Sequence, residues 1–196
     1  MIAQSELRRK IVHILLGTVL SLLYLYGILT RGRFLALLGG VLFMFLFYLF
    51  WEIPVLHQFM LLVEREEDMK RIPGIGAIFF VVGFTLAAWL FPHDIALAAM
   101  LILTWADGGS VIAGAFGHVP FFNRKKSWEG IIAGILAGGA ASLVAVSAFE
   151  GLIAATLAMF VEGMDLEIVG WRVNDNLTVP LVSGLVMIGL RFIGSM

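Results

Sequence analysis

The sequence predicts an all-α protein, a polytopic bundle of six to seven transmembrane helices. Of its 196 residues, 61% are hydrophobic and only 14% are charged, and the mean hydropathy of +1.00 lies far above the balance of a soluble domain. Apolar segments of the length that spans a bilayer recur along the whole chain. We therefore expect residues 1–196 to form a single integral membrane domain. The absence of cysteine excludes a disulfide framework, a thiol nucleophile and a thiolate metal site.

Six apolar segments are long enough to cross the membrane, and we expect a helix in each. In chain order they cover residues 11–29, 34–50, 74–91, 95–116, 130–149 and 177–194. The first lacks an obvious small-residue cleavage site, so we expect a retained helix rather than a signal peptide. The fifth carries small residues at every fourth position, which predicts tight helix–helix packing; these are Gly130, Gly134, Gly138 and Ser142. A shorter apolar stretch at 151–162 is either a seventh span or a re-entrant helix.

The positive charges indicate the orientation of the bundle. With seven spans, ten of the 13 lysines and arginines fall on the side of the N-terminus and three on the other. A re-entrant 151–162 segment gives the same ratio. Because basic residues accumulate in cytoplasmic loops, we expect the N-terminus and the 117–129 loop to lie in the cytoplasm.

The fourth span contains a lone aspartate, Asp107, deep in an apolar segment. An ionised carboxylate at that depth costs several kcal/mol unless it has a partner, which makes it a functional-site hypothesis. Asp107, Ser110 and Gly114 share one helical face because they are spaced i, i+3 and i+7. Gly108 and Gly109 predict a break or unwound turn that lines a cavity. The alternative is an aspartate satisfied by a neighbouring helix, with the glycines used for packing.

A basic loop punctuated by glycines follows this aspartate. Its polar residues and glycines are Gly117, Arg124, Lys125, Lys126, Ser127, Glu129 and Gly130. Ser127 resembles a helix N-cap, and the N–H groups of a helix start attract phosphate. A carboxylate that holds a divalent cation, beside lysines that hold phosphate oxygens, is suited to handling a nucleotide. The alternative for the basic cluster is a topology anchor that binds anionic lipid headgroups.

Other polar residues are expected near the same membrane face. His13 lies about one turn into the first span and should face the bundle interior, where it meets a carboxylate, a phosphate or a backbone carbonyl. The segment from Glu64 to Arg71 is typical of a solvated amphipathic stretch. Secondary site candidates are Arg9, Lys10, Glu52, Glu162, Asp175 and Asn176.

Four motifs together resemble the dolichol kinase/phytol kinase family, integral membrane enzymes that use CTP to phosphorylate a lipid alcohol. They are an aspartate with a small residue at +3 and glycine at +7, a Lys-Lys-Ser-x-Glu-Gly ending, an N-terminal Arg-Lys-x-x-His helix and an Asp-Asn-x-x-x-Pro tail. The resemblance extends from Arg9 to Pro180, and CDP-diglyceride synthetases share a related pattern in the 107–130 segment. The chain departs from the family at Ser110, where alanine is usual, and at Gly117, which precedes the expected second glycine at the position of His118.

The resemblance implies roles for these residues. Asp107 would hold Mg²⁺ or another divalent cation at the phosphates of CTP, and Lys125 and Lys126 would neutralise charge on the transferred group. Glu129 would fix a lysine or hold a second metal. Nucleotide contacts are expected from Gly114, Gly117, Arg124, Lys125, Lys126, Ser127 and Gly130.

The resemblance also implies the reaction, which is phosphoryl transfer to the hydroxyl of an isoprenoid alcohol of the dolichol, polyprenol or phytol type. His13 or Glu162 would accept the proton of the alcohol. We expect a lipid alcohol, CTP and the membrane as partners and no nucleic acid, and we assign no oligomeric state.

The main alternative is a CTP:phosphatidate-type cytidylyltransferase, which makes a CDP-activated lipid at a similar site. A small ion-coupled transporter with Asp107 as an ion ligand is a weaker alternative, because such proteins often carry internal repeats and none is evident here. A scaffold that binds anionic lipids would explain the basic loop but not the buried aspartate.

Overall fold

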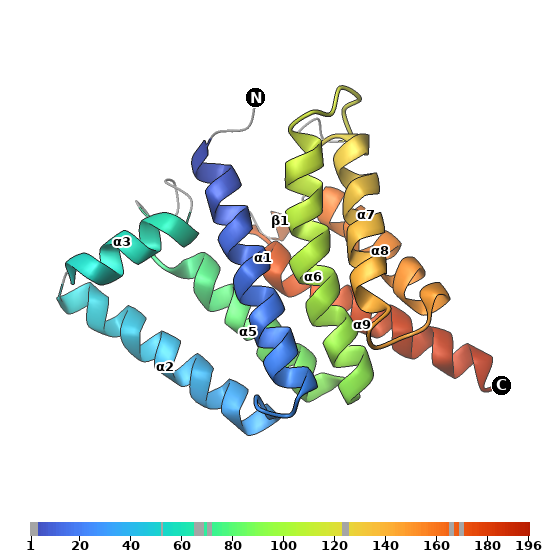
Figure 1. Ribbon diagram of the computed structural model, residues 1–196, viewed down its shortest axis with the longest axis horizontal. Helices are drawn as coiled ribbons and strands as arrows, with labels where there is room; N and C mark the ends of the chain where they lie inside the picture. The colour runs from blue at the N-terminus through green and yellow to red at the C-terminus, as the bar shows by residue number, and fades with distance from the viewer. Residues whose placement is uncertain are drawn as a thin grey trace.

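The computed structural model describes residues 4–51, 53–64, 69, 72–122, 126–164, 167–168 and 171–196. These residues form eight helices and one antiparallel pair of two-residue strands, β1 (Glu167–Ile168) and β2 (Trp171–Arg172) (Figure 1). The helices are α1 (Gln4–Leu25), α2 (Arg31–Phe50), α3 (Pro54–Val63), α5 (Ile75–Leu90), α6 (His93–Gly114), α7 (Trp128–Ser142), α8 (Ala148–Gly163) and α9 (Asp175–Gly194). The expected all-α class is confirmed.

Helix α6 is the centre of the bundle. It contacts α1, α5, α7, α8 and α9. Of the residues in its most apolar 18-residue stretch, 78% are buried inside the protein. The corresponding fraction for α2 is 11%, so α2 is an outer helix that leans away from α1 (Figure 1). Any residue on α6 is therefore surrounded by several other helices.

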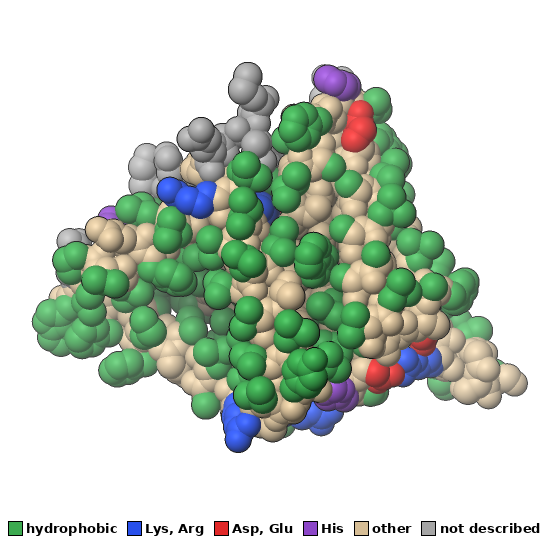
Figure 2. Space-filling view, in the orientation of Figure 1, with side chains coloured by type: hydrophobic (Ala, Val, Ile, Leu, Met, Phe, Trp, Pro, Cys, Tyr) green, Lys and Arg blue, Asp and Glu red, His purple; other side chains and the backbone are tan. Residues whose placement is uncertain are grey.

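The surface of the bundle is that of an integral membrane protein. Among the described residues, α2, α6 and α9 are long and apolar enough to cross a membrane, and α3 and α5 are shorter apolar helices. On the face shown in Figure 2, hydrophobic side chains cover the middle, and charged side chains gather toward the two ends. An apolar band between two polar ends matches the hydrocarbon layer of a bilayer and the water on either side of it.

The expected break at Gly108 and Gly109 is wrong, because α6 is one continuous helix from His93 to Gly114. Both glycines serve close packing instead. A Cβ on Gly108 would collide with the side chain of Ile14 on α1, and one on Gly109 would lie 3.0 Å from Cβ of Ala137 on α7. The pair lets two helices approach α6 while its backbone hydrogen bonds remain intact.

Two helix boundaries also differ from the expected spans. The 130–149 segment is not one helix, because α7 ends at Ser142 and α8 begins at Ala148. A capping box formed by Ser147 and Glu150 starts α8 at Ala148, one residue before the end of the expected span. Helix α3 was not expected; Pro54 stands in its first turn, where its missing N–H removes no helical hydrogen bond.

The small residues of α7 pack tightly against neighbouring helices, as expected, and Gly134 and Gly138 face α6. A Cβ on Gly134 would lie 2.8 Å from the carbonyl oxygen of Ala106, and one on Gly138 would lie 2.8 Å from the Cβ of the same alanine. This close approach is characteristic of small-residue helix pairs in membranes. It places the start of α7, and the loop before it, beside the end of α6.

Candidate functional site

A buried ion pair joins α1 to α6 at the candidate site. Lys10 Nζ donates to Asp107 Oδ2, and the two residues are only 2% and 3% exposed. His13 Nε2 lies 3.4 Å from the same carboxylate oxygen. The helices approach closely because Gly17 of α1 has no side chain where Thr104 of α6 lies. A neighbouring helix therefore supplies the partner that a buried carboxylate needs.

Three carboxylates from three helices meet at this point. Oxygen atoms of Asp107 on α6, Glu162 on α8 and Asp175 at the start of α9 all lie within 4.8 Å of one another. Glu162 is 4% exposed, and its Oε2 is buried without a hydrogen-bond partner. Carboxylate oxygens are the ligands that hard divalent cations prefer, and a cation would satisfy the unpartnered oxygen. These residues fit a magnesium ion.

A second lysine approaches the carboxylates from the 117–127 loop. Lys126 Nζ donates to Glu162 Oε1, whose side chain is fully buried. Burial alone would lower the pKa of Lys126, but the carboxylates of Glu162 and Asp175 outweigh it and hold this pKa above its ordinary value. Lys126 is therefore a cation at neutral pH.

A hairpin-like pairing of the loop directs Lys126 inward. The N–H of Phe121 donates to the carbonyl of Lys126 at 2.7 Å, and the N–H of Trp128 donates to the carbonyl of Val119 at 2.9 Å. Phe121 is buried and packs edge-on against Trp128 and Phe160. This aromatic cluster fixes the loop on α8, the helix that carries Glu162.

The loop ends in the expected N-cap. Ser127 Oγ accepts from the N–H of Gly130 at 3.2 Å. Glu129 Oε1 accepts from the N–H groups of His118 and Val119 at 2.9 and 3.2 Å. Glu129 thus closes the loop, and it is not a member of the carboxylate group formed by the described residues.

Four of the expected nucleotide-binding residues lie together at this corner. A Cβ on Gly114 would contact Ser127 Oγ and Gly130 Cα at 3.5 and 3.6 Å, and one on Gly117 would lie 2.9 Å from Glu129 Oε2. The end of α6, the loop and the start of α7 therefore pack closely. Arg124, Lys125 and Glu52, also expected at the site, lie outside the described residues.

The start of α9 contributes two of the secondary candidates, Asp175 and Asn176. Asn174 caps the helix by accepting from the N–H of Asn176 at 3.0 Å, and Asn176 Nδ2 donates to the carbonyl of Gly76 at 3.2 Å. This second bond fixes α9 against α5. Arg9, on α1, forms an ion pair with Glu6 at 2.5 Å.

Glu64 is not solvated, in contrast to the expectation for the 64–71 segment, of which residues 65–68, 70 and 71 lie outside the described residues. It is only 7% exposed, and its Oε1 accepts from the N–H of Ala77 at 2.9 Å in the first turn of α5. The N-cap of this helix is Gly74, which has no side chain to satisfy the free N–H groups. A carboxylate from another segment, here Glu64, is favoured at such a helix start. The sequence signal for this contact is the glycine at the N-cap of α5.

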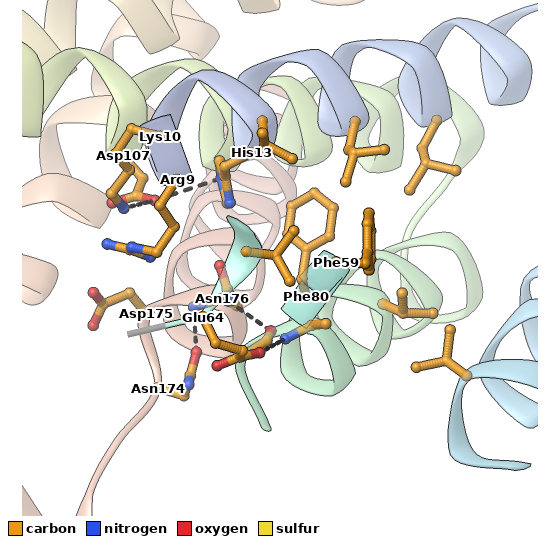
Figure 3. A pocket seen from close by; sticks show the side chains of 18 of the residues that line it. Arg9, Lys10, His13, Phe59, Glu64, Phe80, Asp107, Asn174, Asp175 and Asn176 are labelled. Carbon is orange, nitrogen blue, oxygen red and sulfur yellow. Dashed lines mark hydrogen bonds and ion pairs between the residues drawn. The ribbon is translucent and has the colours of Figure 1, made fainter. Parts of the chain in front are cut away.

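A cavity of about 530 Å³ adjoins the carboxylates. Figure 3 shows polar side chains at one end of it and apolar side chains at the other. The polar end is lined by Arg9, Lys10, His13, Asp107, Asp175 and Asn176. The apolar end is lined by valine, leucine and phenylalanine side chains of α1, α2, α3 and α5. An amphiphile with one polar end fits such a cavity.

Comparison with known proteins gives relatives over most of the chain. A CTP-dependent diacylglycerol kinase 1 from Eremothecium gossypii is 25% identical over 95% of this chain and 67% of its own length. One from Schizosaccharomyces pombe is 28% identical over 63% of this chain and 62% of its own length. A phytol kinase from Synechocystis sp. is 27% identical over 94% of this chain and 79% of its own length. No model of a protein family matches the chain, and no solved structure matches it.

The chain is thus a homologue of CTP-dependent diacylglycerol kinases and phytol kinases. These relatives are phosphotransferases with an alcohol acceptor, which confirms the resemblance drawn from the motifs and the expected class of enzyme. The match spans about two thirds of the length of the diacylglycerol kinases.

Proposed function

We propose that this homologue of lipid kinases transfers the γ-phosphoryl group of CTP to the hydroxyl of an isoprenoid lipid alcohol of the dolichol, polyprenol or phytol type. One observation carries the proposal. The carboxylates of Asp107, Glu162 and Asp175, of which the first two are buried, lie between two lysines, beside a cavity with one polar and one apolar end. The names of the relatives support CTP as the donor and a lipid alcohol as the acceptor.

The three carboxylates are the proposed magnesium ligands. Asp107 and Glu162 each give one oxygen to a lysine, and Glu162 keeps a buried oxygen without a partner. Bound there, Mg²⁺ would neutralise charge on the phosphates of CTP. In this proposal Glu129, which the sequence favoured as a second ligand, shapes the loop instead through its bonds to the N–H groups of His118 and Val119.

The 117–129 loop is the proposed phosphate-binding segment. Lys126 stays charged beside Glu162 and lies where it can neutralise the transferred group. We assign Arg124 and Lys125 the same role from their sequence positions. Gly114, Gly117 and Gly130 let the end of α6, the loop and the start of α7 pack closely, and we assign these glycines and Ser127 the role of shaping the segment that holds the phosphates.

His13 is the proposed base. Its Nε2 is buried without a hydrogen-bond partner, 3.4 Å from Asp107 Oδ2. The hydroxyl oxygen of the alcohol attacks the γ-phosphorus, and the bond from that phosphorus to the β–γ bridging oxygen breaks. CDP leaves, and the proton of the hydroxyl passes to His13 Nε2. The nearby carboxylate of Asp107 stabilises the imidazolium that forms.

We propose seven spans in one domain, namely α1, α2, α5, α6, α7, α8 and α9. Arg191 at the end of α9 pairs with Asp94 and Glu150, which lie at the starts of α6 and α8, at 2.6 and 2.5 Å. The carboxylates lie in the opposite halves of these three helices. This arrangement supports a full pass by α8 rather than a re-entrant helix. The positive-inside rule then favours a cytoplasmic site.

The test is product analysis with purified protein, magnesium, radiolabelled CTP and a panel of prenols, diacylglycerol and phosphatidate. We expect CDP and a lipid phosphate from a prenol. Pyrophosphate and a CDP-lipid from phosphatidate would establish the cytidylyltransferase instead. Asp107→Asn should abolish turnover, while Asp94→Asn at the opposite end of α6 should retain it. Retained turnover in Asp107→Asn would overturn the assignment.

A further inference from the structure

We propose that the hydrocarbon chain of the acceptor lies in a groove between α1, α2 and α5, and that this groove sets the chain length the enzyme accepts. The inference rests on the proposed function and adds the location of the acceptor chain. The groove is the apolar end of the 530 Å³ cavity beside the carboxylates. In Figure 3 it continues along α1 from the labelled polar side chains.

Helix α1 provides one continuous wall of the groove. Val12, Leu16, Val19 and Leu20 line the cavity at positions i, i+4, i+7 and i+8, one face of a helix. Leu16 and Val19 are 41% and 51% exposed although they face the cavity. From His13 to Leu20 the helix rises about 10 Å. The apolar stripe therefore runs along α1 away from the polar end, as the hydrocarbon chain of a lipid alcohol requires.

The opposite walls are apolar as well. Leu37 and Val41, one turn apart on α2, face the groove, and Phe80 and Val81 of α5 line it from inside the bundle. Leu20 and Leu37 lie in the halves of α1 and α2 that the 26–30 turn joins. A polar ligand would lose its hydrogen bonds against these walls, whereas a hydrocarbon loses none.

His13 marks the boundary between the two ends. Its Nε2 lies 3.4 Å from Asp107 Oδ2, and its ring centroid lies 4.7 Å from that of Phe80. A lipid alcohol with its hydroxyl at His13 would place its first carbons against Phe80 and the rest along α1. Since α2 is mostly exposed to the bilayer, the chain enters sideways between α1 and α2 without leaving the membrane.

The first test is selectivity for chain length. Val19→Trp on α1 and Val41→Trp on α2 each fill the groove from a different wall. We expect each to raise the KM for geranylgeraniol by about tenfold and to raise the KM for geraniol, whose chain is shorter, much less. Leu15→Trp is the matched control, because Leu15 is 60% exposed on the same helix and does not line the groove. Unchanged KM for geranylgeraniol in both groove variants would overturn the proposal.

The second test does not depend on turnover or on the variants. Wild-type protein is irradiated with a farnesol analogue that carries a diazirine at its tail, and the labelled peptides are identified by mass spectrometry. We expect labels in the 16–20 and 37–41 segments that unlabelled geranylgeraniol removes by competition. Labels elsewhere, or labels that only phospholipid removes, would exclude the groove. If wild-type protein phosphorylates no alcohol with CTP, the proposed function fails, and the labelled positions still decide where the chain binds.

Discussion

Lys10 and Asp107 are 97 residues apart in the sequence, yet they form a buried ion pair between α1 and α6. A protein with such a pair is little more stable than one in which apolar residues replace both partners. Removal of one partner, however, leaves an uncompensated buried charge. Stability and activity at this site can therefore be separated experimentally.

Lys10→Met should destabilise the protein by about 3–5 kcal/mol, because the Asp107 carboxylate loses its partner. Lys10→Met combined with Asp107→Asn should recover most of this loss, since neither charge remains, but should stay inactive. Thermal unfolding in detergent measures the first effect and CTP turnover the second. A double variant no more stable than Lys10→Met would show that the pair is not the source of the loss.

Glu162→Gln should raise the magnesium concentration needed for half-maximal activity by at least about tenfold, because Glu162 is a proposed ligand. Glu129→Gln should leave this requirement unchanged, since Glu129 binds the backbone of its own loop. Magnesium titrations of turnover compare the two variants. The opposite result would restore Glu129 as a metal ligand.

Gly134→Val should destabilise the bundle by about 1–3 kcal/mol through overpacking, because the new Cβ would lie 2.8 Å from the carbonyl oxygen of Ala106. Gly39→Val on α2 serves as the control, as no atom lies within 4 Å of the Cβ position there. Unfolding temperatures in the same detergent provide the comparison. Equal shifts in the two variants would mean that α7 does not depend on its small residues.

The Lys126–Glu162 pair has a defined pH dependence. Because the pKa of Lys126 in the folded protein is raised above 10.5, its contribution to stability is fully present below that pH and is lost as the pH rises through the raised value. The stability difference between wild type and Lys126→Met should therefore stay constant through the mildly alkaline range and shrink only as the pH rises through the raised value. Unfolding temperatures across that range test it, and a difference that shrinks well before the ordinary pKa of lysine is reached would contradict the raised pKa.

The proposed orientation can be tested with single cysteines, because the chain has none of its own. His118→Cys lies in the exposed loop at the site end, and Arg33→Cys lies at the start of α2 at the other end. A maleimide that cannot cross membranes should label His118→Cys only from the cytoplasmic side and Arg33→Cys only from the opposite side. Labelling of both from one side would exclude the seven-span topology.

Much of the fold could be predicted because spanning segments are read from hydropathy alone. Helices α2, α5, α6 and α9 begin and end within three residues of the expected spans. Helix α1 begins seven residues earlier than expected, at Gln4, because hydropathy marks the apolar part of a helix and not its polar first turns. The turn between α7 and α8 was missed because alanine and valine residues fill it and only the Ser147 cap marks the new start.

The site was predicted less completely. Asp107 could be recognised because a single charged residue in an apolar segment is evident from the sequence, even when its partners are unknown. Its neighbours Glu162 and Asp175 were only secondary candidates, since their meeting depends on how α6, α8 and α9 pack. Glu129 was preferred as a ligand for its closeness in sequence, and Lys10 had an ordinary explanation as a topology signal. Sequence spacing within one helix identifies a face, but it does not identify which faces meet.

The two site lysines have a consequence for how the protein is made. Lys10 and Lys126 hold two of the three clustered carboxylates without any divalent ion. Many small metal sites form only when the metal binds, because the unfolded chain contains no preformed site. Here the chain carries its own counter-ions for two of the carboxylates, so the assembly of the helices does not depend on the proposed magnesium ion.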